Sequence, residues 1–513
     1  MDTKKELVYG ASLSVIFTIT RLAVSAIGTA VIIKLLLPEE YGLLRWLIII
    51  SSYSLLFSQI GSNAIITKHL VRLSTEGKRE EKKRFLIDAI AIQNLGLLVS
   101  TIVIFGLVLP ILAKHSAFRD VSDDVILMGR IIGIAIVLQS NVVLSTKLLE
   151  AEFSMVKGRL LDFLAGFIIV FELIFVLIYG LIGAPIGLFV GGLIVFLIGC
   201  VVVYGEIYKK YKDVKMSDRG MCGLFLKESS LVFMLLLFNT IFISADMLLL
   251  GLYVAPLQVG YYAFAQSIAM LLVPIIASPA PILYPYIIEK HTKGEEKAVV
   301  DLSLKLTILI GLSLFGILAS VGGIGVRWIF SEYIPAIPLM ILLSFFFIWL
   351  SLANNVMGPV LNAYSEYVFL MKVKSIIAVM NIVGNIVLIP KFGIYGALCA
   401  TAVSITLDLG ICSWKTLKLT GVSAPIRSTI KMAFSLVIAS TFTYSLVKFM
   451  SLSTNFPEII VILIALLLYT LLFVLIFSKI LKGFEDMDKT LLKDAMETLP
   501  FSDKIYRIYN AIC

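Results

Sequence analysis

From residue 8 to residue 478 the chain alternates, almost without pause, between apolar runs of about 20 residues and short polar segments. A helix of about 20 residues crosses the roughly 30 Å hydrocarbon core of a bilayer. A mean hydropathy of +1.01 excludes an ordinary soluble domain. We therefore expect an all-α polytopic membrane protein. About fourteen transmembrane helices are predicted, at residues 8–33, 43–66, 86–112, 125–148, 160–182, 184–205, 230–254, 258–286, 303–327, 337–363, 375–390, 395–417, 429–449 and 457–478.

Basic residues give these spans an orientation, because Lys and Arg near span ends stay on the cytoplasmic side. Most of the 43 Lys and Arg residues fall on one side when the N-terminus is placed inside, with clusters at 68–84, 209–227 and 479–507. We expect a multi-pass protein of the plasma (cytoplasmic) membrane with both termini in the cytoplasm. The formal net charge of +9 then reflects topology and contact with anionic lipids, and it does not call for nucleic acid as a partner.

A long basic loop separates two sets of six spans that both start on the same side, as in transporters built from parallel repeats. A weak internal similarity supports this division, since LLLPEEYGLLRW (35–46) and LYVAPLQVGYYAFA (252–265) each place Tyr and Gly after a turn. The predicted parts are an N-lobe at 1–205, a cytoplasmic linker at 206–229, a C-lobe at 230–420, two further helices at 421–478 and a cytoplasmic amphipathic tail at 479–513.

The loops leave little room for enzyme chemistry, which normally needs acid, base or nucleophile groups on a sizeable loop at one face. The three histidines lie on separate loops without metal-binding spacing, and the five cysteines imply no disulfide framework. We expect no enzyme activity, no metal and no bound cofactor. The function should therefore lie among the helices.

Arg21 lies near the middle of the first expected span. A charge at bilayer depth costs roughly 2.5–3.5 kcal/mol, so it normally faces a protein interior or a water-filled cavity. Thr18, Arg21, Ser25 and Gly28 follow at helical steps and share one face. Because a guanidinium binds phosphate through two parallel hydrogen bonds, Arg21 predicts a site for an acidic headgroup. The alternative is a structural ion pair with a carboxylate such as Glu172.

Two more spans of the first lobe show a polar face with one arginine each. Arg45, Gln59 and Asn63 share a face of the second span, and Arg130 and Asn141 share a face of the fourth. Together with the face of Arg21 they predict a cationic, substrate-binding cavity. For the arginines of the second and fourth spans, snorkelling to the outer interface is an equal alternative.

Three acidic residues at bilayer depth, Glu172, Asp246 and Asp408, are candidates for coupling transport to an H⁺ or Na⁺ gradient. In the second lobe we expect only acidic charges at this depth. A membrane potential could also drive the cycle, since moving one charge through 100 mV yields about 2.3 kcal/mol. Asn381 and Asn385, at helical spacing, are expected to hydrogen-bond between helices.

Proline and glycine mark two kinds of special helix. Pro274 and Pro359 lie inside expected spans and should kink or break them, because proline lacks an N–H and clashes with the preceding turn. Gly183, Gly187 and Gly191 form a small-residue ladder that predicts close helix packing.

Four stretches of the chain have a combined order, spacing and loop chemistry that resemble one family. They are LLLPEEYGLLRWLIIISSYSLLFSQIGSNAIITKHL (35–70), SADMLLLGLYVAPLQVGYYAFAQSIAMLLVP (244–274), PYIIEKHTKGEE (285–296) and LNAYSEYVFLMKVKSIIAVMNIVGNIVLIPKFGIYGALCATAVS (361–404). They resemble the Wzx-type polysaccharide flippases of the multidrug, oligosaccharidyl-lipid and polysaccharide exporter superfamily.

The resemblance implies a two-lobed protein of fourteen helices that moves a lipid-linked oligosaccharide between leaflets by alternating access. It also implies a cavity arginine in the first helix, the place that Arg21 takes. The branch that moves the peptidoglycan precursor carries another arginine in helix eight, which residues 258–286 lack. Drug exporters of the superfamily usually carry an acidic residue in the first helix, which has Arg21 instead.

The leading hypothesis is a flippase for an isoprenoid-phosphate-linked oligosaccharide in cell-surface glycan biosynthesis. Its expected partners are this lipid-linked substrate, membrane lipids and the glycan polymerase or glycosyltransferase machinery. A cation-coupled small-molecule antiporter of the multidrug exporter (MATE) type is the first alternative. A membrane-embedded glycan polymerase or ligase is the second.

Overall fold

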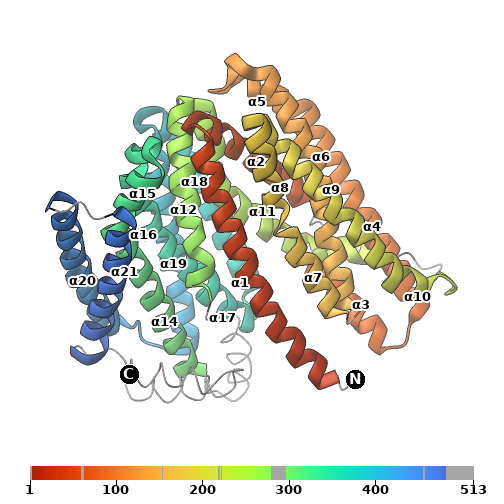
Figure 1. Ribbon diagram of the computed structural model, residues 1–513. Coiled ribbons are helices and arrows are strands. Elements are labelled where there is room, and N and C mark those ends of the chain that lie inside the picture. The colour runs from red at the N-terminus through yellow and green to blue at the C-terminus, as the bar shows by residue number, and fades with distance from the viewer. Residues whose placement is uncertain are drawn as a thin grey trace. The chain divides into compact units, whose positions relative to one another are not determined.

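The computed structural model describes residues 3–58, 63–152, 154–217, 220, 222–278, 296–453 and 457–480 (Figure 1). All regular elements in these ranges are helices, which confirms the predicted fold class. Ten helical stretches in the same ranges are long and apolar enough to cross a membrane, so the chain is a multi-pass membrane protein. One of them, Met155–Tyr211, covers two expected spans. The count of fourteen stays a prediction.

The chain forms two compact units, and a short segment of the first lies within the sequence of the second. Unit 1 comprises Met1–Gly260 and Ile389–Ile394, and unit 2 comprises Tyr261–Leu388 and Tyr395–Cys513. The helices of unit 1 are α1 (Thr3–Leu35), α2 (Pro38–Ser58), α3 (Asn63–Thr75), α4 (Arg79–Thr101), η1 (Ile102–Val108), α5 (Leu109–His115), η2 (Arg119–Val121), α6 (Ser122–Ala151), α7 (Met155–Ala165), α8 (Ile168–Tyr179), η3 (Gly180–Ile182), α9 (Gly183–Val203), η4 (Tyr204–Tyr208), α10 (Lys209–Tyr211) and α11 (Cys222–Tyr253).

Helix α12 (Pro256–Ile276) starts in unit 1 and continues in unit 2. The other helices of unit 2 are α14 (Glu296–Ile317), η5 (Leu318–Gly322), α15 (Gly323–Ile329), η6 (Ser331–Ala336), α16 (Ile337–Leu352), η7 (Ala353–Met357), α17 (Gly358–Ala363), α18 (Tyr367–Phe392), α19 (Ile394–Thr420), α20 (Ile426–Ser453), α21 (Glu458–Val474) and η8 (Leu475–Ile480).

Glycines bring α8 and α9 into close contact in unit 1. Gly180, at φ +62°, lets the chain turn back between the two helices, a conformation that favours glycine. A Cβ added at Gly183 would lie 2.0 Å from the Phe175 carbonyl oxygen, and one at Gly187 would lie 2.4 Å from the Glu172 Cα. The glycine ladder therefore serves helix packing, as predicted.

Helix α11 packs on α2 within unit 1. The indole Nε1 of Trp46 donates a hydrogen bond of 3.1 Å to the Leu248 carbonyl oxygen, and Gly251 leaves room for the same ring. One turn earlier in α11, Ser244 hydrogen-bonds the Tyr53 hydroxyl at 2.8 Å. These contacts place α11 in unit 1, although it follows the long basic loop.

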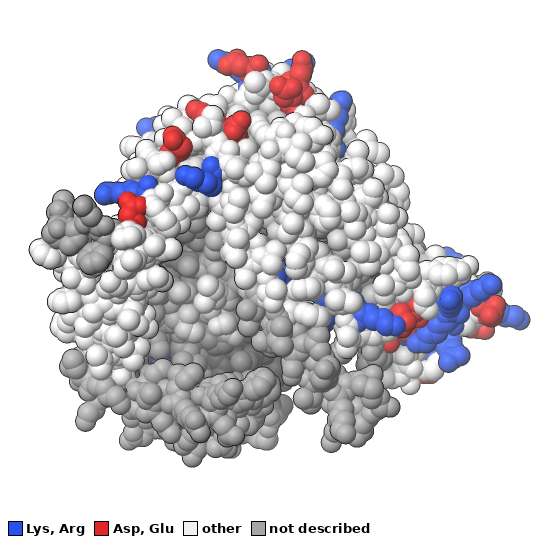
Figure 2. Space-filling view, viewed as in Figure 1, with Lys and Arg blue, Asp and Glu red and all other residues white. Residues whose placement is uncertain are grey.

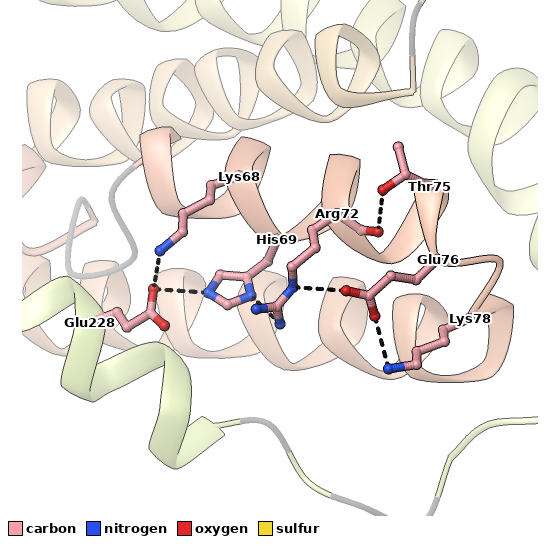
Figure 3. A network of polar contacts seen from close by, with 7 residues as sticks. All are labelled: Lys68, His69, Arg72, Thr75, Glu76, Lys78 and Glu228. Carbon is pink, nitrogen blue, oxygen red and sulfur yellow. Dashed lines mark hydrogen bonds and ion pairs between the residues drawn. The ribbon is translucent and has the colours of Figure 1, made fainter.

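Charged side chains of unit 1 gather at two ends. Figure 2 shows one group where α3 and α10 lie and another near α5, with a band between them that carries few charges. At the first end, Glu228 of α11 accepts hydrogen bonds from Lys68 at 3.1 Å and from the buried His69 ring at 2.9 Å (Figure 3). Arg72 continues the network from His69 towards Glu76. A band with few charges is what a unit that spans the bilayer requires.

Unit 2 tests the predictions for its polar and proline residues. Asn385 donates to Asn381 at 3.0 Å, and Asn381 reaches Thr401 of α19 at 3.4 Å, which confirms a hydrogen bond between helices. Just before Pro359, the helix changes to the π-helical segment η7. A proline cannot continue the regular hydrogen-bond ladder, so the chain leaves the α-helical pattern there, but the helical stretch continues from Ser331 to Ala363 and is not broken. Pro274 lies inside α12, which is not broken at it either.

Candidate functional site

Unit 1 contains a pocket of about 330 Å³. Five helices contribute to its wall, and its polar lining combines one arginine, two carboxylates, one amide and two hydroxyls. The residues that line it are Arg21, Ser25, Gln139, Val142, Val143, Thr146, Asp162, Ala165, Gly166, Ile168, Ile169, Glu172 and Leu188.

Arg21 reaches this pocket from α1, which packs against α7 and α8. Between α7 and α8 the chain breaks at Gly166, and a Cβ there would lie 2.3 Å from the Arg21 Cγ. The glycine thus makes room for the aliphatic stem of the arginine. One turn before Arg21, the Phe17 ring stacks on Phe163 of α7 with the centroids 4.7 Å apart. The sequence signal for this arrangement was the polar stripe of the first span, and its Ser25 also lines the pocket.

Arg21 forms an ion pair with Asp162, a residue that our sequence reasoning did not select. Its Nη1 lies 2.6 Å from the Asp162 Oδ1, and both side chains keep 40% of their surface exposed. The alternative of an ion pair with a carboxylate is therefore found, but the partner is Asp162 and not Glu172. The guanidinium is accessible rather than sealed in a dry interior.

Glu172 lies deeper in the same pocket. Its side chain is buried, and Gly187 packs directly against its backbone. Within the described ranges, no cation lies at ion-pair distance from its carboxylate, and Arg45 of α2 is the charged group that acts on it electrostatically. A buried carboxylate without a close cation is expensive, and groups of this kind mark functional sites in membrane proteins.

The other predicted members of the site do not line this pocket. Arg45 is half-buried with its Nε unpaired, and Arg130 is exposed on α6. Neither of these two arginines shares the pocket wall with Arg21, although Arg45 lies close enough to act on the charge of Glu172. The cavity with three arginines stays a prediction. Gln59 lies outside the described residues, as do the side chains of Thr18 and Asn63. Asn141 donates to Asn94 of α4 at 2.9 Å.

The two acidic candidates outside the pocket are both buried. Asp246 of α11 accepts a hydrogen bond from the backbone N–H of Met247. Asp408 of α19 pairs with Lys374 of α18 at 2.6 Å, and Asn354 accepts from the same ammonium group at 2.8 Å. Our expectation that unit 2 carries only acidic charge at depth is wrong, because α18 begins at Tyr367 and brings Lys374 to the buried Asp408.

A second cluster of charges lies outside the pocket at the α10 end of unit 1. Lys82 and Lys210 each approach the buried carboxylate of Glu152 to 2.5 Å, and Tyr211 donates to it at 3.0 Å. Burial raises the pKa of Glu152, but the hydrogen bonds from Lys210 and Lys82 outweigh it and hold the pKa below its ordinary value. This cluster ties α4, α6 and α10 together.

The sequence matches a family described as "Polysaccharide biosynthesis protein" over residues 7–291, more than half of the chain. The chain belongs to this family. The matched region includes all the residues that line the pocket of unit 1. No curated protein sequence matches the chain.

Solved structures share the fold at low sequence identity. The lipid II flippase MurJ, in an inward closed conformation, is 16% identical with a TM-score of 0.74, and the match covers 92% of this chain and 99% of that one. An inward-facing multidrug resistance MATE family transporter of the MOP superfamily is 14% identical with a TM-score of 0.63, and the match covers 79% of this chain and 96% of that one. A mutant of the Vibrio cholerae MATE transporter VcmN is 13% identical with a TM-score of 0.57, and the match covers 81% of this chain and 97% of that one. The chain therefore has the fold that these flippase and transporter structures share, and the family match confirms the predicted resemblance to polysaccharide biosynthesis proteins.

Proposed function

We propose that this member of the polysaccharide biosynthesis family is a flippase. It moves an isoprenoid-phosphate-linked oligosaccharide from the inner to the outer leaflet of the cytoplasmic membrane by alternating access, with both termini in the cytoplasm. The observation that carries the proposal is the accessible Arg21 guanidinium in a pocket of unit 1, within the region that matches the family. A permanently charged guanidinium suits a phosphate group.

The size of the pocket supports a role for the phosphate end of the substrate. Ligand pockets usually enclose about 300–1,000 Å³, so about 330 Å³ accommodates an end group rather than an oligosaccharide. Ser25, Gln139 and Thr146 can hydrogen-bond the phosphate or the first sugar. The remaining sugars then lie outside the pocket, and the isoprenoid chain lies in the lipid.

Energy coupling is assigned as part of the same proposal. Glu172 is the best placed of the acidic candidates, because it shares the pocket with Arg21 and has no close cation. It would exchange H⁺ or Na⁺ with the gradient, or the membrane potential would drive the cycle directly. Asp408 is less suited, since Lys374 already neutralises it.

A multidrug exporter is the second candidate. The two carboxylates in the pocket, Asp162 and Glu172, favour it because they could bind a cationic compound. The fold alone fits both candidates, since it is shared with a flippase and with MATE transporters.

Leaflet transfer tests the proposal. The full-length protein is reconstituted in proteoliposomes with a fluorescent polyprenyl pyrophosphate carrying a disaccharide. We expect transfer by the parent, a loss of about 10- to 100-fold in Arg21→Ala, and partial activity in Arg21→Lys, because charge-assisted hydrogen bonds contribute about 1.5–3 kcal/mol. The matched control is Arg119→Ala, an arginine whose side chain is 74% exposed and lies far from the pocket lining.

Two outcomes would count against the flippase. If Arg21→Ala transfers the lipid as fast as the parent does, the phosphate role of Arg21 is wrong. If the parent moves no lipid but expels ethidium in a manner that Glu172→Gln abolishes, the exporter replaces the flippase.

A further inference from the structure

Asp162 has no role yet in the function proposed above. Its contact with Arg21 is a single one, from Nη1 to Oδ1, and both side chains are two-fifths exposed. Both groups line the polar pocket, so water that enters it can solvate them, and solvated pairs of this kind shift an equilibrium by only about fivefold or less. The carboxylate therefore holds the guanidinium weakly and can be exchanged.

A phosphate and the Asp162 carboxylate compete for the same guanidinium. Both are anions that accept from its N–H groups, and two such anions side by side repel each other. Glu172 in the same pocket adds to the negative potential. An acidic headgroup therefore binds Arg21 best when Asp162 has left, because all the N–H donors of the guanidinium are then available and the repulsion is gone.

Arg21 does not need Asp162 to stay in place. Its stem packs on Gly166, where an added Cβ would lie within 3.2 Å of Arg21 Cβ, Cγ and Cδ. The ring contact between Phe17 and Phe163 joins α1 to α7 one turn away. Packing therefore positions the Arg21 side chain, and the Asp162 carboxylate contacts only its guanidinium group.

We propose that Asp162 is a built-in competitor for the acidic group of the substrate. In the empty pocket it pairs with Arg21, and an arriving phosphate or pyrophosphate takes its place while the carboxylate turns to water in the pocket. The guanidinium is paired in both states, so neither state leaves a bare charge at depth. This inference rests on the proposed function, because it requires Arg21 to bind phosphate.

Such a competitor would determine specificity. A monovalent anion with one weak contact gains too little to displace the carboxylate. A pyrophosphate, with several acceptor oxygens and more charge, displaces it and is released more readily afterwards. Asp162 therefore sets which anions enter and how fast they leave.

The test measures binding rather than transport. Full-length protein in lipid nanodiscs is titrated with farnesyl pyrophosphate and, separately, with inorganic pyrophosphate. We expect Asp162→Asn to bind the ligand about fivefold more tightly than the parent, because the competing charge is gone. The matched control is Glu150→Gln. Glu150, at the end of α6, pairs at 3.4 Å with Arg159 of α7, the helix of Asp162, but it does not line the pocket. Its affinity should equal that of the parent.

The outcomes separate the two proposals. Tighter binding of farnesyl pyrophosphate alone supports the competitor and identifies a lipid headgroup as the ligand, and tighter binding of both probes supports it for the pyrophosphate group itself. Equal or weaker binding in Asp162→Asn overturns the competitor, and Asp162→Ser provides the same test if the first variant does not fold. Failure of the flippase proposal is a different result, namely unchanged binding in Arg21→Ala.

Discussion

Two ion pairs of the same length occupy very different surroundings. The pair of Arg21 and Asp162 in unit 1 and the pair of Lys374 and Asp408 in unit 2 both measure 2.6 Å. In the first, each side chain is 40% exposed and lines a pocket. In the second, the exposed fractions are 9% and 0%, and Cys412 and Asn354 take the remaining polar contacts.

The difference shows how surroundings decide the use of an ion pair. A pair that water reaches contributes little to stability and can exchange a partner for a ligand. A buried pair cannot exchange, since losing one partner leaves an uncompensated charge in a medium of low dielectric constant. We therefore interpret the pair in unit 1 as functional and the pair in unit 2 as structural.

The largest expected loss of stability comes from breaking the buried pair of Lys374 and Asp408. Lys374→Met should lower the free energy of unfolding by about 3–5 kcal/mol, because Asp408 would remain charged and alone. Arg21→Met should lower it by about 1 kcal/mol at most, because both side chains of that pair are solvated. Unfolding of the purified protein in detergent by titration with SDS measures both values.

A double variant serves as control for this contrast. Replacing both charges, with Lys374→Met and Asp408→Leu together, should restore stability close to that of the parent, since no unpaired charge remains. Equal losses in Lys374→Met and Arg21→Met would show that the two pairs do not differ as we argue.

A smaller effect is expected for two glycines near the exposed pair. In Gly187→Ala the new Cβ meets the Glu172 backbone at 2.4 Å, which cannot move aside, so we expect a loss of about 1–3 kcal/mol. In Gly166→Ala it meets the Arg21 side chain, which can turn away, so stability should fall by less than 1 kcal/mol.

Gly166→Ala should instead weaken ligand binding. Turning the arginine away from α7 separates it from the pocket, so binding of farnesyl pyrophosphate should weaken. If Gly166→Ala loses more stability than Gly187→Ala, the arginine stem is held more rigidly than an exchangeable group allows.

The smallest expected effect is on the pH dependence of stability. It tests whether a buried carboxylate outside the candidate spans also stabilises the fold through its ion pairs. Glu152 is buried like Asp408 but lies outside the candidate spans. Because its pKa in the folded protein lies below the ordinary 4.5, its contacts with lysine stabilise the fold above about pH 4.5. This contribution is lost as the pH falls through the lower folded-state value. Thermal unfolding from pH 7 to pH 3 should show this acid loss in the parent and less of it in Glu152→Gln, and identical profiles would contradict it.

Hydropathy predicted most of the fold, because an apolar run of about 20 residues by itself indicates a helix that spans the membrane. The turn that begins at Gly180 separates α8 from α9 within three residues of residue 183, the boundary that the sequence predicted between the two spans. The ends of helices were harder to predict, since a charged residue looks like a loop residue. Helix α18 begins at Tyr367, eight residues before the predicted span, and so carries Lys374 into the interior of unit 2.

Of the residues that line the pocket, the sequence predicted mainly those of the first helix. The stripe of Arg21 and Ser25 is local, so helical spacing was enough to find it. Asp162 lies 141 residues further along, and no pattern in one sequence tells which distant carboxylate meets which arginine. Gln139 was missed for the same reason, whereas Arg130 was selected although it lies on the exposed surface of α6.

The modest size of the pocket would have a consequence for the diversity of surface glycans. If the proposed flippase binds only the phosphate end of its substrate in this pocket, it does not contact the sugars beyond it. New glycosyltransferases could then change the exported glycan while the flippase stayed unchanged, so the two would evolve separately.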